Sequence, residues 1–190
     1  WSNAEELFTW TNAREASLSL PLSNSDSSLI IRMRLSPFLV PGKLYQQRMV
    51  VYAEELKLGE WNLTKSGIQD VNIVIPQEVI KEPILNIKLK FPDAASPQQF
   101  GLSDDSRMLG IAVSSITIYR ADDVELDSLI KFDKDSNNNI FMTSGWSQAE
   151  HNFTWNDGEK AQLILPIKPT DQNLTLKVNL HPFIVPGKHN

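Results

Sequence analysis

The chain has 190 residues, a formal net charge of −5 at pH 7 and no cysteine. This length allows one large domain, or one domain and part of another. The acidic balance argues against a nucleic-acid partner, because phosphate binding needs clustered lysines and arginines. The lack of cysteine excludes disulfides and thiolate metal sites, and no run of eighteen apolar residues offers a membrane-inserted segment.

The first forty-three residues are repeated later in the chain. Trp1–Lys43 and Trp146–Lys188 align at an offset of 145 with no gap, and twenty of the forty-three aligned positions are identical. The shared motifs are W-S-x-A-E-x-x-F-T-W at the start and P-F-x-V-P-G-K at the end. Self-similarity at a fixed period predicts a tandem array of one structural unit.

Two alternating segments open the first copy. Apolar residues take every second position in residues 15–22 and again in residues 29–35, which is typical of strands with one buried face. The inward positions are Ala16, Leu18, Leu20, Leu22, Leu29, Ile31, Met33 and Leu35, and in the second copy Ala161, Leu163, Leu165, Ile167, Leu174, Leu176, Val178 and Leu180. Because both copies keep the same parity, we predict strands in both and full burial of Leu20 and Leu165.

The middle of the chain predicts more strands and two short helical turns. The strands are expected at residues 47–53, 56–63, 71–75, 85–91 and 110–119. The first two should form a hairpin around Glu54 and Glu55. Ser96-Pro97 is a suitable start for a helical turn, and residues 77–81 offer another before Pro83.

The expected strand at residues 110–119 changes parity along its length. Ile111 and Val113 lie on one side of the alternation, whereas Ile116 and Ile118 lie on the other. Two interpretations remain open: a bulge near Ser114 and Ser115, or a strand buried on both faces.

Together these elements predict an all-β fold, an antiparallel β-sandwich of the jelly-roll type. Residues 1–121 form the first unit, which we expect to lack its opening strands, and residues 122–128 are an acidic linker. Residues 129–190 hold the opening part of a second unit, with strands at 130–132 and 140–143 around the polar loop 133–139. We expect the chain to be a piece of a longer protein.

Trp10 and Trp155 end the repeated F-T-W and are candidate ligand-binding residues. An exposed tryptophan on a sandwich suits stacking against the C–H-rich face of a sugar ring. The competing interpretation is that each ring closes one end of a core, which is the commoner fate of a large aromatic residue.

Charged candidates accompany the repeat. Glu5 and Glu150 occupy one position of the repeat, and the loop G-L-S-D-D-S-R supplies Asp105 and Arg107. A carboxylate and a guanidinium could bind a hydroxyl-rich ligand, or form an ion pair that ties a loop to the sandwich. Glycoside hydrolysis would need a second carboxylate facing Glu5 across a cleft, for which the sequence offers no supporting spacing.

No pattern predicts a metal, a cofactor or an enzyme. The segment Asp133–Asn137 is similar to the start of a calcium loop, but the sixth and twelfth positions are Asn138 and Ser144 instead of glycine and an acid. A solvated loop is therefore the better interpretation. The three histidines have no nucleophile or metal-ligand partner at a useful spacing.

Three motifs together carry a family resemblance. They are G-W-S-x-x-E-x-x-x-x-W at Gly145–Trp155, P-F-x-V-P-G-K at Pro37–Lys43, and S-P-x-x-x-G-L-S-D-D-S-R-x-L-G-I-A-V at Ser96–Val113. The combination resembles an uncharacterised β-sandwich accessory domain appended to bacterial envelope glycan-processing and glycosyltransferase-like membrane proteins. The resemblance spans nearly the whole chain. It implies a non-catalytic, extracytoplasmic role in contact with carbohydrate, in the periplasm or at the cell surface.

The sequence leaves a second function open. The chain could be a purely structural module that stacks in tandem or docks on a protein, with no ligand. The apolar face of the incomplete second copy is expected to be covered in one of three ways: by the first unit, by strand exchange between chains, or by parts of a longer parent protein. Self-association by strand exchange is possible because Trp146–Lys188 could replace Trp1–Lys43 on the rest of a unit.

Overall fold

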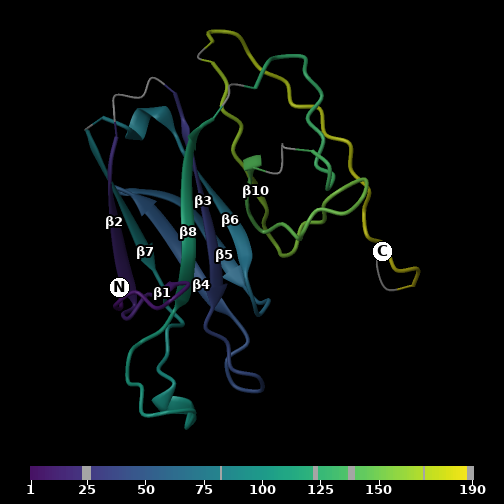
Figure 1. The fold of residues 1–190 in the computed structure, drawn as a ribbon. Helices are drawn as coiled ribbons and strands as arrows, with labels where there is room; N and C mark the ends of the chain where they lie inside the picture. The colour runs from purple at the N-terminus through teal and green to yellow at the C-terminus, as the bar shows by residue number, and fades with distance from the viewer. Residues whose placement is uncertain (23–26, 82, 122–123, 137–139, 169, 188–190) are drawn as a thin grey trace.

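The computed structural model describes residues 1–22, 27–81, 83–121, 124–136, 140–168 and 170–187. Two antiparallel sheets of four strands face each other as a sandwich, and a largely irregular segment from the second copy lies beside them (Figure 1). The predicted all-β antiparallel sandwich is confirmed. No helix in the described part of the chain is long and apolar enough to cross a membrane.

The strands of the first unit form two sheets. The first has the order β1 (Thr9–Trp10), β8 (Ile111–Arg120), β3 (Leu29–Pro37), β6 (Gln69–Ile75), and the second has the order β2 (Glu15–Pro21), β7 (Ile84–Lys90), β4 (Gln47–Ala53), β5 (Leu56–Leu63). Every strand predicted in residues 1–121 is present within two residues of its expected bounds. The 3-10 helices η1 (Gln77–Val79) and η2 (Gln98–Phe100) occupy the two expected helical turns.

The alternation of β2 and β3 sets which side chains form the core. Ala16 in β2 and the inward side chains of β3 are buried between the sheets. Leu18 and Leu20 also face this core but are only half-buried, so the prediction of full burial for Leu20 is wrong. The reason is position: β2 is an edge strand with a single neighbour, β7. Leu165 is half-buried as well.

A bulge in β8 explains its change of parity. Arg34 lies opposite Ser115, whereas Leu35 lies opposite Val113, so Ser114 is the extra residue. The Ser114 hydroxyl donates to the Arg34 carbonyl oxygen at 3.1 Å. The bulge turns Val113 and Ile116 toward the same core. The predicted bulge near Ser114 and Ser115 is therefore confirmed.

The local turn predictions are confirmed too. β4 and β5 pair as a hairpin around Glu54, whose φ of 49° is in the left-handed region. Ser96 and Gln99 exchange hydrogen bonds: the Gln99 N–H donates to Ser96 Oγ at 3.2 Å, and the Ser96 N–H donates to Gln99 Oε1 at 3.1 Å. This reciprocal pair is a capping box, and it fixes the start of η2.

The second unit, residues 129–190, forms only short parts of two of its predicted strands, 140–143 and 161–167. Apart from the pair β9 (Met142–Ser144) and β10 (Gln162–Leu163), its described residues are irregular. The predicted strands at 130–132 and 174–180 are therefore wrong for this chain, and Leu176 and Leu180 are 66% and 84% exposed. In the first copy β3 is hydrogen-bonded on both sides, to β6 and β8; the residues after 163 have no such neighbours among the described strands.

The second copy nevertheless packs on the first unit. Ile30 and Val74 lie on the outer face of the β3–β6 pair, yet are 0% and 1% exposed. With Ala121 they form a small apolar cluster against which Ile140 and Ile164 pack. The Val124 N–H also donates to the Pro166 carbonyl oxygen at 2.6 Å. Residues 122–123 of the expected linker lie outside the described residues.

Candidate functional site

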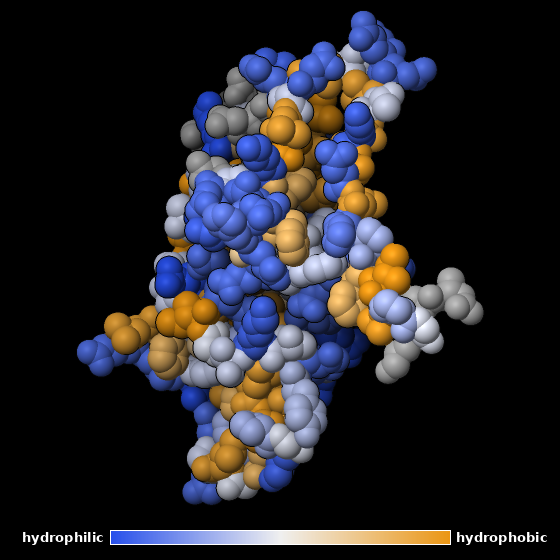
Figure 2. Space-filling view, turned by 90° about the vertical axis from the view of Figure 1, so that its right-hand side faces the viewer, coloured by the Kyte–Doolittle hydropathy of each residue, from blue (hydrophilic) through white to orange (hydrophobic). Residues whose placement is uncertain are grey.

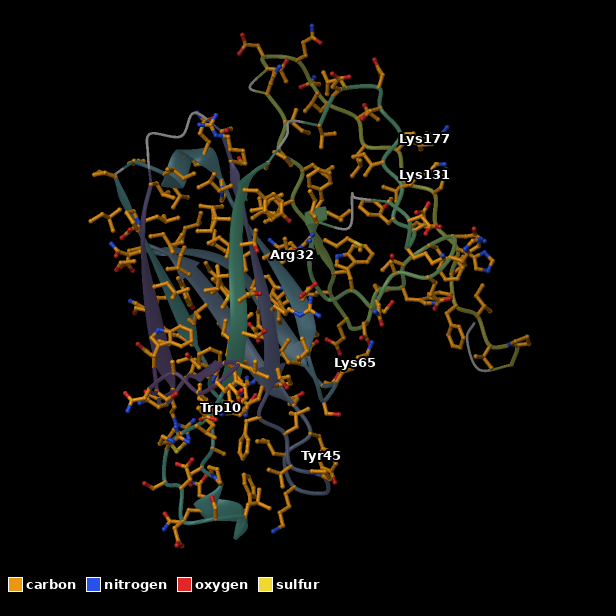
Figure 3. All side chains as sticks on the ribbon, in the orientation of Figure 1. Trp10, Arg32, Tyr45, Lys65, Lys131 and Lys177 are labelled. Carbon is orange, nitrogen blue, oxygen red and sulfur yellow. The ribbon has the colours of Figure 1, made fainter. Side chains whose placement is uncertain are left out.

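Trp10 and Trp155 lie in equivalent aromatic clusters. Trp10 packs edge-on between Phe8 and Phe38, with ring centroids 5.8 and 6.1 Å away. Trp155 packs in the same way between Phe153 and Phe183, at 5.1 and 6.1 Å. The three rings of one cluster are related to those of the other by the offset of 145. Figure 3 shows Trp10, the last residue of β1, at one end of the sandwich. Its ring is half-buried and packs on these aromatic rings, outside the buried core cluster.

The repeated motif also folds the same way twice. Trp1 Nε1 donates to the Ser17 carbonyl oxygen at 2.8 Å, and Trp146 Nε1 donates to that of Gln162 at 2.8 Å. The backbone bonds match too: Ser2 N–H to Trp10 O, Ser147 N–H to Trp155 O, Glu5 N–H to Phe8 O and Glu150 N–H to Phe153 O, all at 2.8–2.9 Å. In each copy the indole is bonded to a strand, β2 in the first and β10 in the second, so the motif keeps one local geometry beside sheets of different size.

Gly145 has a clear reason to precede Trp146. Its φ is +75°, and a Cβ atom there would lie 1.9 Å from the Lys160 carbonyl oxygen. Only glycine combines this backbone conformation with so close an approach of another chain segment.

The predicted charged residues of the first copy come together. Arg107 Nε lies 3.0 Å from both carboxylate oxygens of Asp105, and its Nη2 lies 2.6 Å from Oδ2. Its Nη1 lies 4.0 Å from Glu5 Oε1. Hydrogen bonds from Arg107 hold the pKa of Asp105 below its usual value. The guanidinium is therefore held mainly by Asp105 of its own loop, and the longer contact with Glu5 is its link to the repeat motif.

Glu150 does not take part in an equivalent cluster. The 190 residues contain no position that corresponds to Arg107 in the second copy. The Glu150 side chain is exposed, and its carbonyl oxygen accepts from the Lys134 N–H at 2.8 Å. The structure therefore does not bring Trp155 and Glu150 into a site of the kind expected around Trp10.

A large hollow lies elsewhere, between the first unit and the second copy. It has a volume of about 2030 Å³ and is bounded by β5, β6 and the loop that carries Trp146. Seen from the side of the second copy, hydrophilic side chains cover much of the surface between apolar patches (Figure 2). We call this hollow the inter-unit groove.

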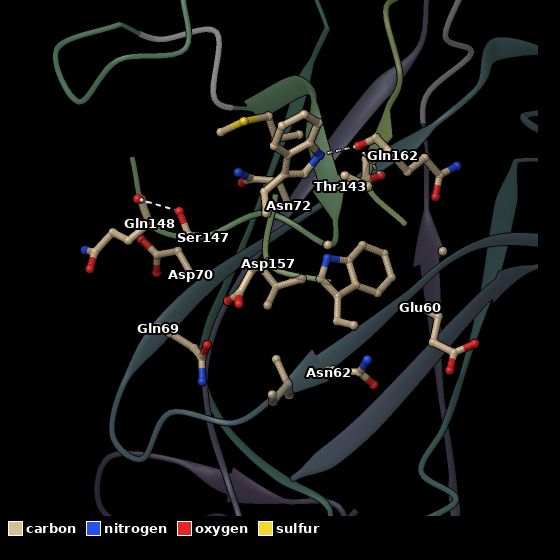
Figure 4. A pocket seen from close by; sticks show the side chains of 18 of the residues that line it. Glu60, Asn62, Gln69, Asp70, Asn72, Thr143, Ser147, Gln148, Asp157 and Gln162 are labelled. Carbon is tan, nitrogen blue, oxygen red and sulfur yellow. Dashed lines mark hydrogen bonds between the residues drawn. The ribbon is translucent and has the colours of Figure 1, made fainter. Parts of the chain in front are cut away.

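Amides and carboxylates line the inter-unit groove. Asn62 comes from β5, Asp70 and Asn72 come from β6, and Asp157 and Gln162 come from the second copy (Figure 4). These β5 and β6 residues are outward positions of strands whose alternate residues are buried in the core. The groove therefore presents both hydrogen-bond donors and acceptors along two walls.

The groove has an aromatic and a cationic element. Trp146 stacks on Phe132 with centroids 6.5 Å apart and an interplanar angle of 15°. Arg32 Nε donates to Asn72 Oδ1 at 3.1 Å, and its guanidinium lies 5.6 Å from the centre of the Tyr119 ring. Trp61 also borders the groove, but it is 7% exposed and belongs to the core.

Sequence reasoning missed this groove. The polar residues of β5 and β6 read as an ordinary solvated face, and nothing in the alternation says that a second copy lies against them. A weak signal was available in Ile30 and Val74, which are apolar at outward positions. Such residues indicate that something covers the outer face.

Comparisons with known proteins do not add a family. No protein-family model matches the chain, and no curated protein sequence matches it significantly. Within the described residues, no group of three or more acidic or histidine side chains is placed to hold a metal ion.

Proposed function

We propose that this chain is a non-catalytic β-sandwich accessory module that contacts carbohydrate of the bacterial envelope, outside the cytoplasm. The observation that carries the proposal is the inter-unit groove, with its amide and carboxylate lining and the half-buried Trp146 at its side. The motif resemblance to accessory domains of envelope glycan-processing proteins points in the same direction.

The chemistry of the groove suits sugars. Hydroxyl groups both donate and accept hydrogen bonds, so they are best matched by mixed side chains such as Asn62, Asn72 and Asp157. An indole offers an apolar plane for the C–H face of a pyranose. The volume exceeds the range of about 300–1,000 Å³ that is typical of small-molecule sites, which favours an oligosaccharide over a monosaccharide.

Isothermal titration with fragments of purified bacterial envelope polysaccharides tests the proposal. Trp146→Ala and Asn62→Ala should each weaken binding about ten-fold, or roughly 1.4 kcal/mol. Asn62 is exposed on β5, so its replacement leaves the core and the repeat motif intact.

Two matched controls keep the result specific. Trp1→Ala removes the same indole and the same hydrogen bond from the first copy, outside the groove. Ser19→Ala changes an exposed polar residue on β2, at the opposite edge of the sheet from β5. Equal losses in all four variants, or no binding by the unaltered chain to any fragment, would refute carbohydrate contact in this groove.

A structural role is the second candidate, and a separate observation favours it. The outer face around Ile30 and Val74 is covered by Ile140 and Ile164 of the second unit, residues 129–190. Burial of apolar side chains on the outside of a sandwich is what tandem stacking of units requires. On this alternative the groove is a by-product of stacking and holds no ligand.

Limited proteolysis separates the two functions. Ile164→Ser should detach the second copy and expose residues 140–168 to cleavage, while the first unit stays resistant. If this variant still bound polysaccharide with unchanged affinity, the binding site would lie outside the inter-unit groove. If neither this variant nor the unaltered chain bound polysaccharide, and detachment only lowered the melting temperature, the structural role would be preferred.

A further inference from the structure

In the second copy, an aromatic residue is seated on the repeat motif. The Phe132 ring stacks on Trp146, and Thr154 Oγ1 donates to the Phe132 carbonyl oxygen at 2.6 Å. The next strand, β9, pairs with β10, so that Leu163 lies opposite Met142. Residues upstream of Gly145 thus cover one side of the motif.

The first copy has the same seat. Trp1, Thr9 and Leu18 correspond to Trp146, Thr154 and Leu163, and all three pairs are identical. In the first unit these side chains line a mainly apolar hollow of about 390 Å³, whose other wall is the bulged part of β8 from Val113 to Ile116. We call this hollow the Trp1 pocket.

The strand beside the Trp1 pocket has an unpaired edge. In the second sheet β2 is terminal and pairs with β7 alone among the described strands. Its residues Ser17 and Leu18 correspond to Gln162 and Leu163, which form β10 and pair with β9. An open strand edge next to an apolar pocket is the arrangement that accepts an added extended segment.

We propose that the Trp1 pocket and the free edge of β2 form an acceptor site for an extended segment that carries an aromatic residue. The occupant is a segment of the Ile130–Asp133 type that precedes the W-S-x-A-E motif in the same chain. Its phenylalanine stacks on Trp1, and its carbonyl oxygen accepts a hydrogen bond from the Thr9 hydroxyl. The strand that follows it pairs with β2.

The internal repeat selects this occupant. The structure contains the same tryptophan, threonine and leucine arrangement twice. In the second unit an aromatic residue is bound to it, and in the first unit it is open. The second unit shows which groups bind to this arrangement: an aromatic ring, a backbone carbonyl oxygen that accepts a hydrogen bond, and a short strand. This acceptor site lies on the other side of the sandwich from the inter-unit groove, so it does not depend on the carbohydrate proposal.

A graft tests the acceptor site in the full chain. An additional stretch with the sequence of residues 129–145 is joined directly before Trp1. The added phenylalanine then has the same spacing to Trp1 that Phe132 has to Trp146. The matched control carries alanine in place of the added phenylalanine. The phenylalanine graft should melt higher than the alanine graft by about 3–8 °C, the shift expected when one buried ring stabilises a unit of this size.

A Trp1→Ala change in both grafts completes a double-mutant cycle. The advantage of phenylalanine should disappear when Trp1 is absent, and light scattering should show a monomer throughout. Equal melting temperatures of the two grafts, or an advantage that survives Trp1→Ala, would overturn the proposal. A dimer that forms only with the phenylalanine graft would overturn it as well, because the added segment of another molecule would then fill the pocket.

Discussion

Arg48 holds Asp93 with two parallel hydrogen bonds, from Nε to Oδ2 and from Nη2 to Oδ1, each 2.8 Å long. The Arg48 backbone N–H adds a third bond to Oδ2 at 3.1 Å. These bonds tie the start of β4 to the turn that follows β7. Hydrogen bonding to Arg48 is the main reason why the pKa of Asp93 lies below its ordinary value.

The Arg48–Asp93 pair predicts a pH-dependent contribution to stability. The folded pKa of Asp93 lies below the unfolded value of about 3.9, so the contribution is complete above that value and is lost as the pH falls through the folded pKa. Asp93→Asn should lower the free energy of unfolding by about 1–2 kcal/mol at pH 7. Urea titrations at pH 7, 5 and 3 should show the difference from the unaltered chain narrowing at pH 3.

The Lys57–Glu60 pair is a suitable comparison, because both side chains are exposed. Glu60→Gln should change stability by less than about 0.5 kcal/mol at any of these pH values. If the Asp93→Asn difference stayed constant from pH 7 to pH 3, the charge of Asp93 would not be its cause.

Thr11 is a buried hydroxyl that joins β1 to β8. Its Oγ1 accepts hydrogen bonds from the N–H groups of Gly110 and Ile111, at 3.2 and 3.1 Å. Thr11→Val keeps the shape and leaves these buried donors without the hydroxyl, which should cost about 1–3 kcal/mol. Chemical denaturation measures the loss. Thr117→Val at an exposed position of β8 should be close to neutral. A similar cost there would show that the effect does not come from the buried hydrogen bonds of Thr11.

Gly110 faces the Phe91 ring in the core. A Cβ atom at this position would lie 2.7 Å from Phe91 Cγ, and the ring is fully buried. Gly110→Ala should therefore lower stability by about 1–3 kcal/mol through overpacking. Gly158→Ala serves as the control, because its Cβ would meet nothing closer than 4.0 Å. A drop in melting temperature for Gly158→Ala alone would contradict this account.

The first unit could be predicted from sequence because local pattern and tertiary packing agree there. The alternation in β3 matches a strand with neighbours on both sides, and the parity change at Ser114 marks the bulge that the register shows. Leu20 shows the limit of the alternation pattern. The pattern correctly predicts that Leu20 faces the core, but it does not predict that β2 is an edge strand, where that side chain is only half-buried. Residue types suggested an ion pair between Glu5 and Arg107 as one of two alternatives, but they did not indicate that Asp105 would be the closer partner of Arg107.

The inter-unit groove and the Trp1 pocket could not be predicted in the same way. Both depend on which segments lie next to each other, and period-two patterns do not encode that. The failure at Leu174–Leu180 has the same origin. These residues carry the strand pattern as clearly as Leu29–Leu35 do, but a strand exists only where hydrogen-bonding neighbours exist.

Residues 174–180 have no hydrogen-bonded neighbour among the described strands, and this leads to a prediction for hydrogen exchange. Amide hydrogens of β3 are bonded to β6 or β8 and should exchange slowly, whereas those of residues 174–180 should exchange quickly in a monomer. Their apolar side chains would each forgo about 1.5 kcal/mol or more of burial. Exchange of strands between chains could cover them, because the strands that pair with β2 and β3 in one molecule would accept the equivalent residues of another molecule.

Hydrogen exchange measured by mass spectrometry at two protein concentrations, together with light scattering, distinguishes the monomer from the strand-exchanged form. Fast exchange at both concentrations with a monomeric mass is expected from the structure, and protection that rises with concentration would indicate strand exchange. A monomer in which residues 29–35 and 174–180 exchange equally slowly would contradict both, and would require sheet partners for the second copy within the same chain.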